Sequence, residues 1–334
     1  MLRLGSRADR TVRKSVLVSV IGAAVLLAAC VTTERAKPVA PPVNEFSLER
    51  RQTMVGAVGS YVTREEDTLI DIARRYDLGF TQLVAANRGI DPWLPGAGHR
   101  LVLPSRYILP AGPRRGVVIN LVQQRLYYFS PDGRKVETHP IGVAVQGWST
   151  PHGTTTVVAK QLHPAWYPPP SIRKEQPELP EMVPPGPDNP LGDYALRLGW
   201  AGYLIHGTNK PDGVGRNSSH GCIRLFPEDI EWLFSAVPVG TSVRVVQEEV
   251  QAAWIDDEFY VAVYPSKDQA DQLQTGEPVT PRSPPGLRKR VAAAAGAGRL
   301  DRIDWHEVER AGRDRTGIPV RVTVPRVSSA GALY

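Results

Sequence analysis

The longest uncharged apolar run of the chain lies near its beginning, from Ser15 to Ala29. It follows an arginine-rich start and ends in the local sequence Leu-Ala-Ala-Cys, at Cys30. The run is shorter than the roughly 20 residues that a membrane-spanning helix needs. A basic start followed by a short apolar segment is typical of a secretory signal. The pattern therefore predicts an export signal over residues 1–30.

Apolar positions recur at helical spacing between residues 60 and 104. Leu69, Ile72, Ala73 and Tyr76 fall on one face of a helix, and Asp67 is placed to cap its first turn. A second short helix is expected from Thr81, with short strands before the first helix and after the second. The predicted order is strand, helix, helix, strand.

Strand-type patterns dominate residues 115–247. The β-rich runs are Val117 to Leu121, Arg125 to Phe129, Thr154 to Val158, Tyr203 to Ile205 and Ser242 to Val246. One helix is expected from Pro227, which suits a first turn, with Ile230, Leu233, Phe234 and Val237 on its buried face. The prediction is a mainly β, open sandwich-like domain with one clear helix.

A proline-dense segment over residues 161–189 interrupts this pattern and cannot be a central strand. Two interpretations stay open. The segment is a flap over a cleft, with Trp166 as an apolar contact for a substrate, or it is a surface excursion with a structural tryptophan.

The flanking segments are less regular. Residues 31–59 contain prolines and few large apolar side chains, which indicates a flexible linker. Residues 252–334 are predicted to hold a strand or strand pair, a proline-rich and basic linker over Pro278 to Arg290, an alanine-rich low-complexity stretch and a last small element. No function is assigned to this extension.

Composition adds three constraints. Of the 334 residues 42% are hydrophobic, which predicts a folded chain, and the net charge is +6. A basic surface suits nucleic acid, anionic lipid or a carboxylate-rich polymer, but no basic block interleaved with aromatic residues supports nucleic acid. The two cysteines, Cys30 and Cys222, lie in local contexts that each explain them without a disulfide.

Cys222 lies in the segment that concentrates the chemistry. His206 follows an apolar strand, and a polar loop leads from it to Ser219-His220-Gly221-Cys222. An imidazole beside a thiol can take its proton and hold the charge as an ion pair, which makes a nucleophile for acyl transfer. The main-chain N–H groups around His220 to Cys222 are natural donors for the oxyanion that such a reaction forms.

Two alternatives were weighed for these residues. His206, His220 and Cys222 could ligate zinc, although their spacing does not match common ligand sets, so neither a metal nor another cofactor is predicted. Arg224 could bind substrate, or it could form a surface ion pair with Glu228 or Asp229.

Two N-terminal patterns resemble known modules. The stretch from Tyr61 through DTLIDIARRYDLGFTQLVAANRG to HRLVLP resembles a LysM module, which implies binding to glycans such as peptidoglycan. The alternative is a small α+β adaptor that only packs on the next domain. The sequence ending at Cys30 resembles a bacterial lipobox, which implies a lipid on that cysteine and favours the outer membrane.

The stretch IHGTNKPDGVGRNSSHGCIRL resembles the signature of L,D-transpeptidases with a YkuD-type catalytic domain, and the likeness extends over about residues 115–247. It implies Cys222 as the nucleophile and His206 as the proton acceptor and donor. Gly207 would orient that histidine through its carbonyl, and His220 and Gly221 would complete the site. Ser219, Arg224 and Trp166 are the expected substrate-binding residues.

The resemblance implies a two-step reaction on peptidoglycan. The thiol attacks the carbonyl of the third residue of a tetrapeptide stem, commonly meso-diaminopimelate, and D-Ala leaves. An amine on a second stem, or a lysine of an envelope protein, then accepts the acyl group. Two alternatives remain: a hydrolase of the carboxypeptidase type with the same chemistry, and an inactive peptidoglycan-binding envelope protein.

Overall fold

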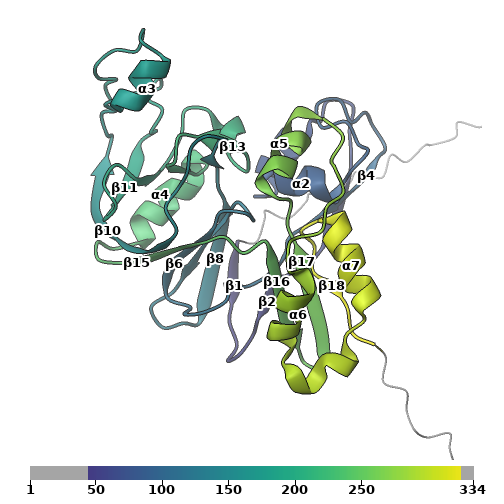
Figure 1. Cartoon of the computed structure of the whole chain (residues 1–334). Coiled ribbons are helices and arrows are strands. Elements are labelled where there is room, and N and C mark those ends of the chain that lie inside the picture. Colours follow the sequence, from purple (N-terminus) through teal and green to yellow (C-terminus); the bar gives the residue numbers. More distant parts are fainter. Residues whose placement is uncertain (1–43, 325–334) are drawn as a thin grey trace, which may run out of the picture. The chain divides into compact units, whose positions relative to one another are not determined.

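A computed structural model of the chain describes residues 44–324 (Figure 1). Residues 1–43 and 325–334 lie outside the described part, and with them lie the predicted export signal, Cys30 and the first part of the expected linker, residues 31–43. Among the described residues, none of the helices has both the length and the apolar character required to span a membrane.

A nine-stranded mixed sheet forms the centre of the larger domain, with the strand order β1-β8-β7-β6-β15-β10-β11-β12-β14. Most neighbours are antiparallel, whereas β6 and β15 run parallel, as do β12 and β14. The strands are β1 Glu45–Ser47, β6 Gly116–Asn120, β7 Arg125–Phe129, β8 Lys135–Pro140, β10 Gly153–Leu162, β11 Tyr194–Leu198, β12 Leu204–His206, β14 Ile223–Arg224 and β15 Ser242–Val246. β9 (Val143–Ala144) and β13 (Asn217–Ser219) form a separate parallel pair.

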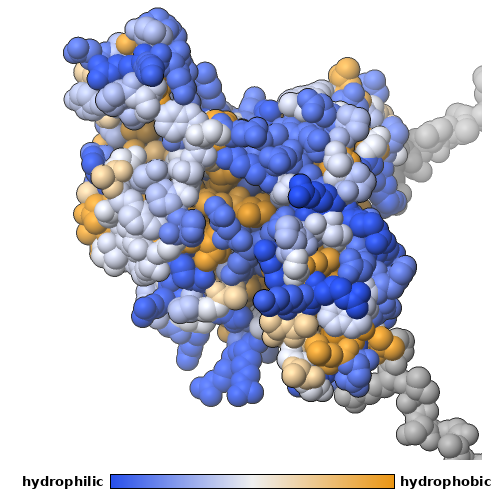
Figure 2. Space-filling model, in the orientation of Figure 1, coloured by the Kyte–Doolittle hydropathy of each residue, from blue (hydrophilic) through white to orange (hydrophobic). Residues whose placement is uncertain are grey.

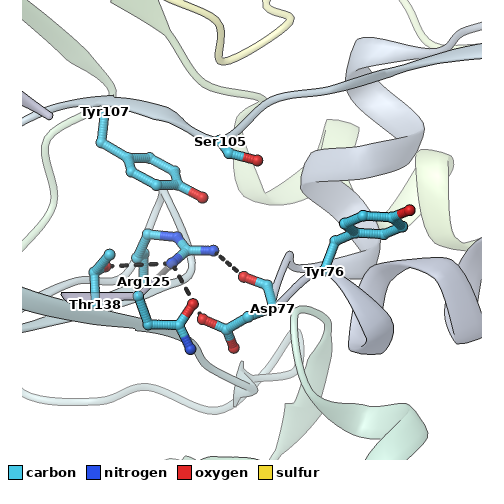
Figure 3. Close-up of a pocket in the computed structure, with 7 residues that line it drawn as sticks. Tyr76, Asp77, Ser105, Tyr107, Arg125 and Thr138 are labelled. Carbon is cyan, nitrogen blue, oxygen red and sulfur yellow. Dashed lines mark hydrogen bonds and ion pairs between the residues drawn. The ribbon is translucent and has the colours of Figure 1, made fainter. Parts of the chain in front are cut away.

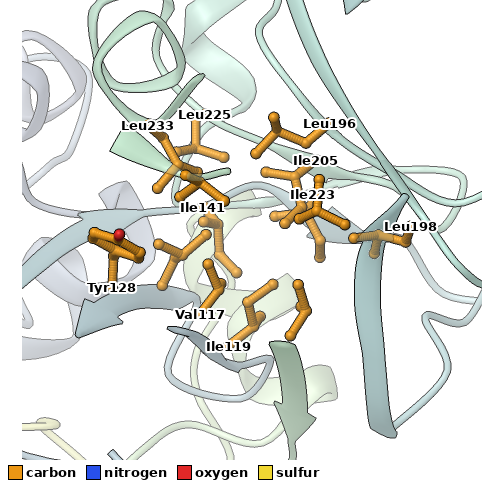
Figure 4. Close-up of a cluster of buried hydrophobic side chains, with 14 of the residues drawn as sticks. Val117, Ile119, Tyr128, Ile141, Leu196, Leu198, Ile205, Ile223, Leu225 and Leu233 are labelled. Atoms are coloured by element: carbon orange, nitrogen blue, oxygen red, sulfur yellow. The ribbon is translucent and has the colours of Figure 1, made fainter. Parts of the chain in front are cut away.

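Apolar side chains from these strands and from helix α4 (Pro227–Ala236) fill one core (Figure 4). Ile205 and Ile223 are register partners on β12 and β14, and both are buried there. Ile230 and Leu233 add the inner face of α4, which starts at Pro227 as expected. Since Ile205 and Ile223 face this core, their neighbours in the strands project from the opposite face of the sheet. That face carries His206 and Arg224.

The small module contains β3 (Gly59–Val62), α1 (Leu69–Arg75), α2 (Phe80–Ala86) and β4 (Arg100–Leu103), with β3 and β4 antiparallel. The predicted order of strand, helix, helix, strand is confirmed. The cap was predicted wrongly: Thr68 caps α1 by accepting a hydrogen bond from the Asp71 N–H. Asp67 is buried instead and accepts hydrogen bonds from the Tyr61 hydroxyl and the Arg64 N–H.

The expected linker is partly ordered. β1 pairs with β8 at the edge of the large sheet, and β2 (Met54–Gly56) pairs with β5 (Arg106–Ile108). Phe46 and Leu48 pack against a buried cluster of Val55, Tyr107, Leu109, Val118, Tyr127, Phe129 and Val136. The linker interpretation was therefore wrong for residues 45–56, because their few apolar residues find partners far along the chain.

The C-terminal extension forms a small α+β unit. β16 (Val250–Ile255), β17 (Glu258–Val263) and β18 (Val320–Arg321) make an antiparallel sheet, packed by α6 (Leu287–Ala295) and α7 (Trp305–Asp314). The expected strand pair and last element are present. The alanine-rich stretch lies mostly in α6, contrary to the low-complexity interpretation, because Leu287, Val291 and Ala295 form a buried helical face. α5 (Lys267–Thr275) precedes it and packs Leu273 into the core of the small module.

The proline-dense segment is organised as well. β10 continues to Leu162, and α3 (Pro170–Glu175) begins at the last of the three consecutive prolines. The fully buried amide of Asn189 donates to the carbonyls of Pro164, Val183 and Pro184. These bonds close the segment at its base. The face of the molecule in Figure 2 is mainly hydrophilic, with hydrophobic residues in separate patches. The mainly β fold with a small βααβ module at its N-terminal side is confirmed.

Candidate active site

His206 and Cys222 are brought together by the parallel pairing of β12 and β14. The register aligns Ile205 with Ile223 and His206 with Arg224, so Cys222 lies one position before the paired Ile223. Leu225 then donates its N–H to the carbonyl of His206, which fixes the two strand ends side by side. Because side chains alternate along a strand, His206 and Arg224 occupy the face opposite the apolar core.

The His206 ring is buried and oriented by its own backbone. Its Nδ1 lies 2.6 Å from the carbonyl oxygen of Gly207. A carbonyl only accepts, so Nδ1 carries the proton and Nε2 remains an acceptor. Burial, and then the charge of Arg224, lower the pKa of His206 to about 3, against smaller effects of the Gly207 and Leu191 carbonyls. The imidazole is therefore neutral near pH 7.

Gly207 is held closely as well. Its N–H donates to the carbonyl of Tyr194 on β11. A Cβ added at this position would lie 3.0 Å from Ile230 on α4 and 3.4 Å from the Leu191 carbonyl. A side chain here would press on the segment that carries the histidine.

Cys222 is a free, half-buried thiol. Its Sγ lies 3.7 Å from the carbonyl oxygen of Gly202, toward which the thiol can donate. Burial raises the pKa of the Cys222 thiol above its ordinary value, although a main-chain hydrogen bond at Leu204 and the Arg224 charge act in the opposite direction. The electrostatics thus favour a neutral thiol beside a neutral imidazole at rest, in place of the expected ion pair.

The turn before Cys222 is tied by Ser219. The nearly fully buried Ser219 hydroxyl donates to the Cys222 carbonyl at 2.6 Å and accepts the Gly221 N–H at 3.1 Å. Gly221 has a φ of +118°, and an added Cβ would lie 3.0 Å from the Ser149 carbonyl. The Gly221 carbonyl accepts the hydroxyl of Thr150. Both polar functions of Ser219 are therefore used inside the turn.

Arg224 lies across the loop that joins the two strands. Its guanidinium donates to the Ser218 carbonyl at 2.7 Å, and its main chain exchanges two hydrogen bonds with Gly142. The alternative of an ion pair with Glu228 or Asp229 is wrong: Glu228 pairs with Arg74 through two bonds of 3.0 Å, and Asp229 faces His139.

His220 makes two contacts that sequence reasoning missed. Its Nε2 lies 3.4 Å from a carboxylate oxygen of Glu175, at the end of α3, and the edge of its ring meets Trp148 with centroids 4.8 Å apart. The proline-dense segment thus reaches the turn that carries Cys222. It does so through Glu175, whereas Trp166 exchanges two main-chain hydrogen bonds with Val183 at the base of the segment. Glu175 and His220 are 45 positions apart in the sequence, so no local sequence pattern could indicate this contact.

The loop between His206 and Cys222 is held by two distant parts of the chain. Thr81 of the small module donates through its N–H and its hydroxyl to the Gly215 carbonyl, at 3.0 and 2.8 Å. Gln274 of α5 donates to the Thr81 hydroxyl and accepts the Asn217 N–H. Asp271 of the same helix accepts from the side chain of Asn217. These contacts fix the loop that the sequence only required to fold back.

The zinc alternative gains no support from the geometry. Within residues 44–324, His206, His220 and Cys222 do not bring three ligand atoms together. The site therefore contains a thiol, a neutral imidazole with a free acceptor nitrogen, and a turn of main-chain donors. Such a set is equipped for acyl transfer through a thioester.

Comparison with known proteins places this site in a family. Residues 114–245 match the L,D-transpeptidase catalytic domain family (YkuD), and residues 61–104 match the LysM domain family. The probable L,D-transpeptidase ErfK/SrfK of Escherichia coli K12 is 36% identical over 263 residues, which are 75% of this chain and 81% of that protein. The probable L,D-transpeptidase YbiS of the same strain is 38% identical over 256 residues, with the same coverage of 75% and 81%.

Among solved structures, L,D-transpeptidase 3 from Mycobacterium tuberculosis aligns with a TM-score of 0.32 and 23% identity, over 44% of this chain and 67% of that one. The assignment rests on the sequence relatives and the two domain matches. The chain belongs to the L,D-transpeptidase family and carries a LysM domain ahead of its catalytic domain.

Proposed function

We propose that this chain is a peptidoglycan L,D-transpeptidase in which Cys222 is the nucleophile and His206 the general base and acid. One observation carries the proposal. The strands that carry Cys222 and His206 are paired side by side, and the bond of His206 Nδ1 to the Gly207 carbonyl supports Nε2 as the proton acceptor.

The first step is acylation. The Cys222 thiol leaves the Gly202 carbonyl by rotation about its Cα–Cβ bond and gives its proton to Nε2 of His206 as the sulfur attacks. The sulfur attacks the carbonyl carbon of the third residue of a tetrapeptide stem. The bond to D-Ala then breaks, and the imidazolium returns the proton to the leaving amine. The products are a thioester on Cys222 and free D-Ala.

The second step is transfer. An amine on another stem, or on a protein lysine, attacks the thioester while His206 takes its proton, and the thiolate leaves and is reprotonated. Two oxyanions form along this path. The Gly221 N–H is bonded to Ser219, so we assign oxyanion stabilisation to the main-chain N–H of Cys222 and to donors outside the Ser219 turn.

The remaining roles follow from position. Ser219 and Gly221 shape the turn, and Gly207 orients the histidine. Arg224 secures the loop and keeps His206 neutral, and His220 lines the mouth of the site together with Glu175. Trp166 is proposed as an apolar contact for the substrate.

The proposal extends to location. The LysM domain would bind the glycan strands whose stem peptides the catalytic domain modifies. A lipid on Cys30 would hold the protein at the outer membrane, facing the periplasm. The proposed segments are a signal over residues 1–30, a tether from residue 31 to the start of β1, the LysM domain over 60–104, the catalytic domain over 115–247 and an extension over 252–334.

The deciding experiment is incubation of the purified protein with tetrapeptide-bearing muropeptides, followed by mass spectrometry. Transpeptidation yields dimers linked between third residues together with free D-Ala. Cys222→Ala abolishes both products while the variant still binds purified peptidoglycan.

Each other outcome has a defined meaning. Tripeptides without dimers show that water is the acceptor, which replaces the transferase assignment by a carboxypeptidase. Unchanged muropeptides with glycan still bound refute the enzyme assignment. Activity that survives a chelator and is lost on thiol alkylation excludes a zinc mechanism.

A further inference from the structure

Three buried side chains lie close together at the first turn of α4. The proposed reaction uses none of them. Asp77 follows α1 of the LysM domain, His139 lies on β8, and Asp229 lies in the first turn of α4. One candidate ligand atom from each residue lies within 4.8 Å of the other two. The residues come from three distant segments, so no spacing in the sequence indicates the cluster.

The polar atoms of this cluster lack hydrogen-bond partners. Asp77 Oδ2, Asp229 Oδ2 and both ring nitrogens of His139 are buried without a hydrogen bond. His139 is only 2% exposed, and Asp77 and Asp229 are each 6% exposed. Buried polar groups in folded proteins are nearly always paired, because leaving them unpaired costs free energy. The cluster therefore has the chemistry of a binding site for a further group.

The charged side chains around the cluster indicate the charge of the group that would bind there. Arg125 is buried beside the cluster and stacks over the Tyr107 ring at 4.3 Å (Figure 3). It donates to the main-chain oxygen of Asp77 at 2.7 Å and stays 4.0 Å from the Asp77 carboxylate. The carboxylates of Asp229 and Glu137 lie beside His139, at 3.1 and 3.6 Å, and not beside Arg125. Carboxylate oxygens bind cations, so the group that would bind here is a cation.

His139 is oriented as a metal ligand would be. Its Nδ1 lies 3.1 Å from an Asp229 oxygen, and its Nε2 lies 3.6 Å from Glu137. Neither contact is a hydrogen bond, so a ring nitrogen is available to a metal, and a carboxylate beside the other nitrogen is the usual surrounding of a metal-bound histidine. One imidazole nitrogen and two carboxylate oxygens suit Zn²⁺ better than Ca²⁺ or Mg²⁺, which prefer oxygen ligands. A cavity of about 60 Å³ beside Asp77 has room for a water, although neither His139 nor Asp229 lines it.

We propose that Asp77, His139 and Asp229 form a structural binding site for a divalent ion of the zinc class, with Glu137 orienting His139. The ion joins the LysM domain to the catalytic sheet and to the helix that follows Cys222. Its binding free energy stabilises that arrangement, because the three ligands are together only in the folded chain.

The test measures Zn²⁺ binding to the full chain without an affinity tag, in a Cys222→Ala background that removes the competing thiol. Chelator-treated protein is titrated with ZnCl₂ by calorimetry and scanned for its Tm. The expected result is one ion per chain and a higher Tm. Ca²⁺ and Mg²⁺ at equal concentration raise the Tm less.

Three variants locate the ion. Asp77→Asn and Asp229→Asn lose stoichiometric binding and the zinc-induced rise in Tm. Glu137→Gln weakens binding by about 10–100-fold, as expected for a residue that orients a ligand. The matched control is Asp193→Asn, which alters an exposed pair with His163 at 3.2 Å and leaves zinc binding unchanged.

Several results would overturn the site. These are the absence of one-to-one binding in the parent protein, an equal response to Ca²⁺, or a zinc-induced rise in Tm that persists in both aspartate variants. If Asp229→Asn fails to fold, Asp77→Asn decides, because Asp77 lies outside the helices, just after α1, and asparagine has nearly the same volume. An unchanged Tm without zinc together with lost zinc binding supports the site, whereas retained binding refutes it.

Discussion

Cys222 and His206 show how far residue identity predicts chemistry. The sequence supplies both residues and the glycine-containing turn between them. It does not supply their charge state, which depends on burial and on Arg224, brought into register with His206 by strand pairing. Burial disfavours the charged form of both side chains, so the electrostatics do not favour the predicted ion pair.

This charge state predicts the pH dependence of thiol alkylation. Because burial raises the pKa of Cys222, the thiolate forms only above the ordinary thiol range, and the rate of reaction with iodoacetamide should rise continuously from pH 6 to 9. Mass spectrometry of the labelled protein measures this rate. Cys222→Ala gives the background from non-specific labelling. A rate that is constant between pH 5 and 8 would instead show a preformed thiolate–imidazolium pair.

At the scale of elements, local pattern was a good guide where neighbours along the chain decide the structure. β7 and β15 have the predicted bounds, and α4 begins at the predicted proline. The local pattern gave wrong predictions where residues far along the chain determine the structure. β1 is ordered by β8, and α6 is formed by a stretch of alanines whose buried face meets the C-terminal sheet. The organisation of the proline-dense segment around Asn189 could not be read from its composition.

Asn189 provides a test of that organisation. Asn189→Ala removes the donor to the Pro164 and Pro184 carbonyls and the acceptor of the Leu191 N–H, whereas the Val183 carbonyl keeps its bond from Trp166, and the variant should destabilise the protein by about 1–3 kcal/mol. Since the Leu191 carbonyl lies near His206, transpeptidation should fall as well. Denaturant unfolding and the muropeptide assay measure the two effects.

The neighbouring exposed residue supplies the control for this variant, because Asp188→Ala should change neither quantity. Asn189→Asp retains the acceptor for Leu191 and loses the donors. If Asn189→Ala were as stable and as active as the parent, the amide would not hold the segment in place.

At the scale of the whole molecule, the loop between His206 and Cys222 depends on contacts with the LysM domain and the C-terminal extension. The domain order could be predicted from the sequence, and the catalytic signature indicated that the loop must return to the histidine. Which segments hold it could not be predicted, because Thr81, Gly215 and Gln274 carry no mutual signal along the chain.

Gly215 tests this dependence. It has a φ of +70°, and an added Cβ would lie 2.3 Å from the Cα of Gly79 in the LysM domain. Gly215→Ala should therefore displace the loop and reduce transpeptidation strongly, with Cys222 and His206 unaltered in identity.

Gly133 is the matched control, since its φ is +68° and an added Cβ there meets nothing within 4 Å. Gly133→Ala should lose about 1–2 kcal/mol of stability from backbone strain alone and keep its activity. Equal activity losses in the two variants would show that strain, and not contact with the LysM domain, limits the loop.

The hydrogen bonds of Gln274 and Asp271 to Asn217 also bear on when, during synthesis of the chain, the site can be assembled. A chain is synthesised from its N-terminus, so Cys222 and His206 are made before α5. Until that helix has been made, the loop between the two residues lacks one of the two segments that hold it. A nascent chain, or one cleaved before α5, would thus contain both Cys222 and His206 and still be poorly assembled for catalysis.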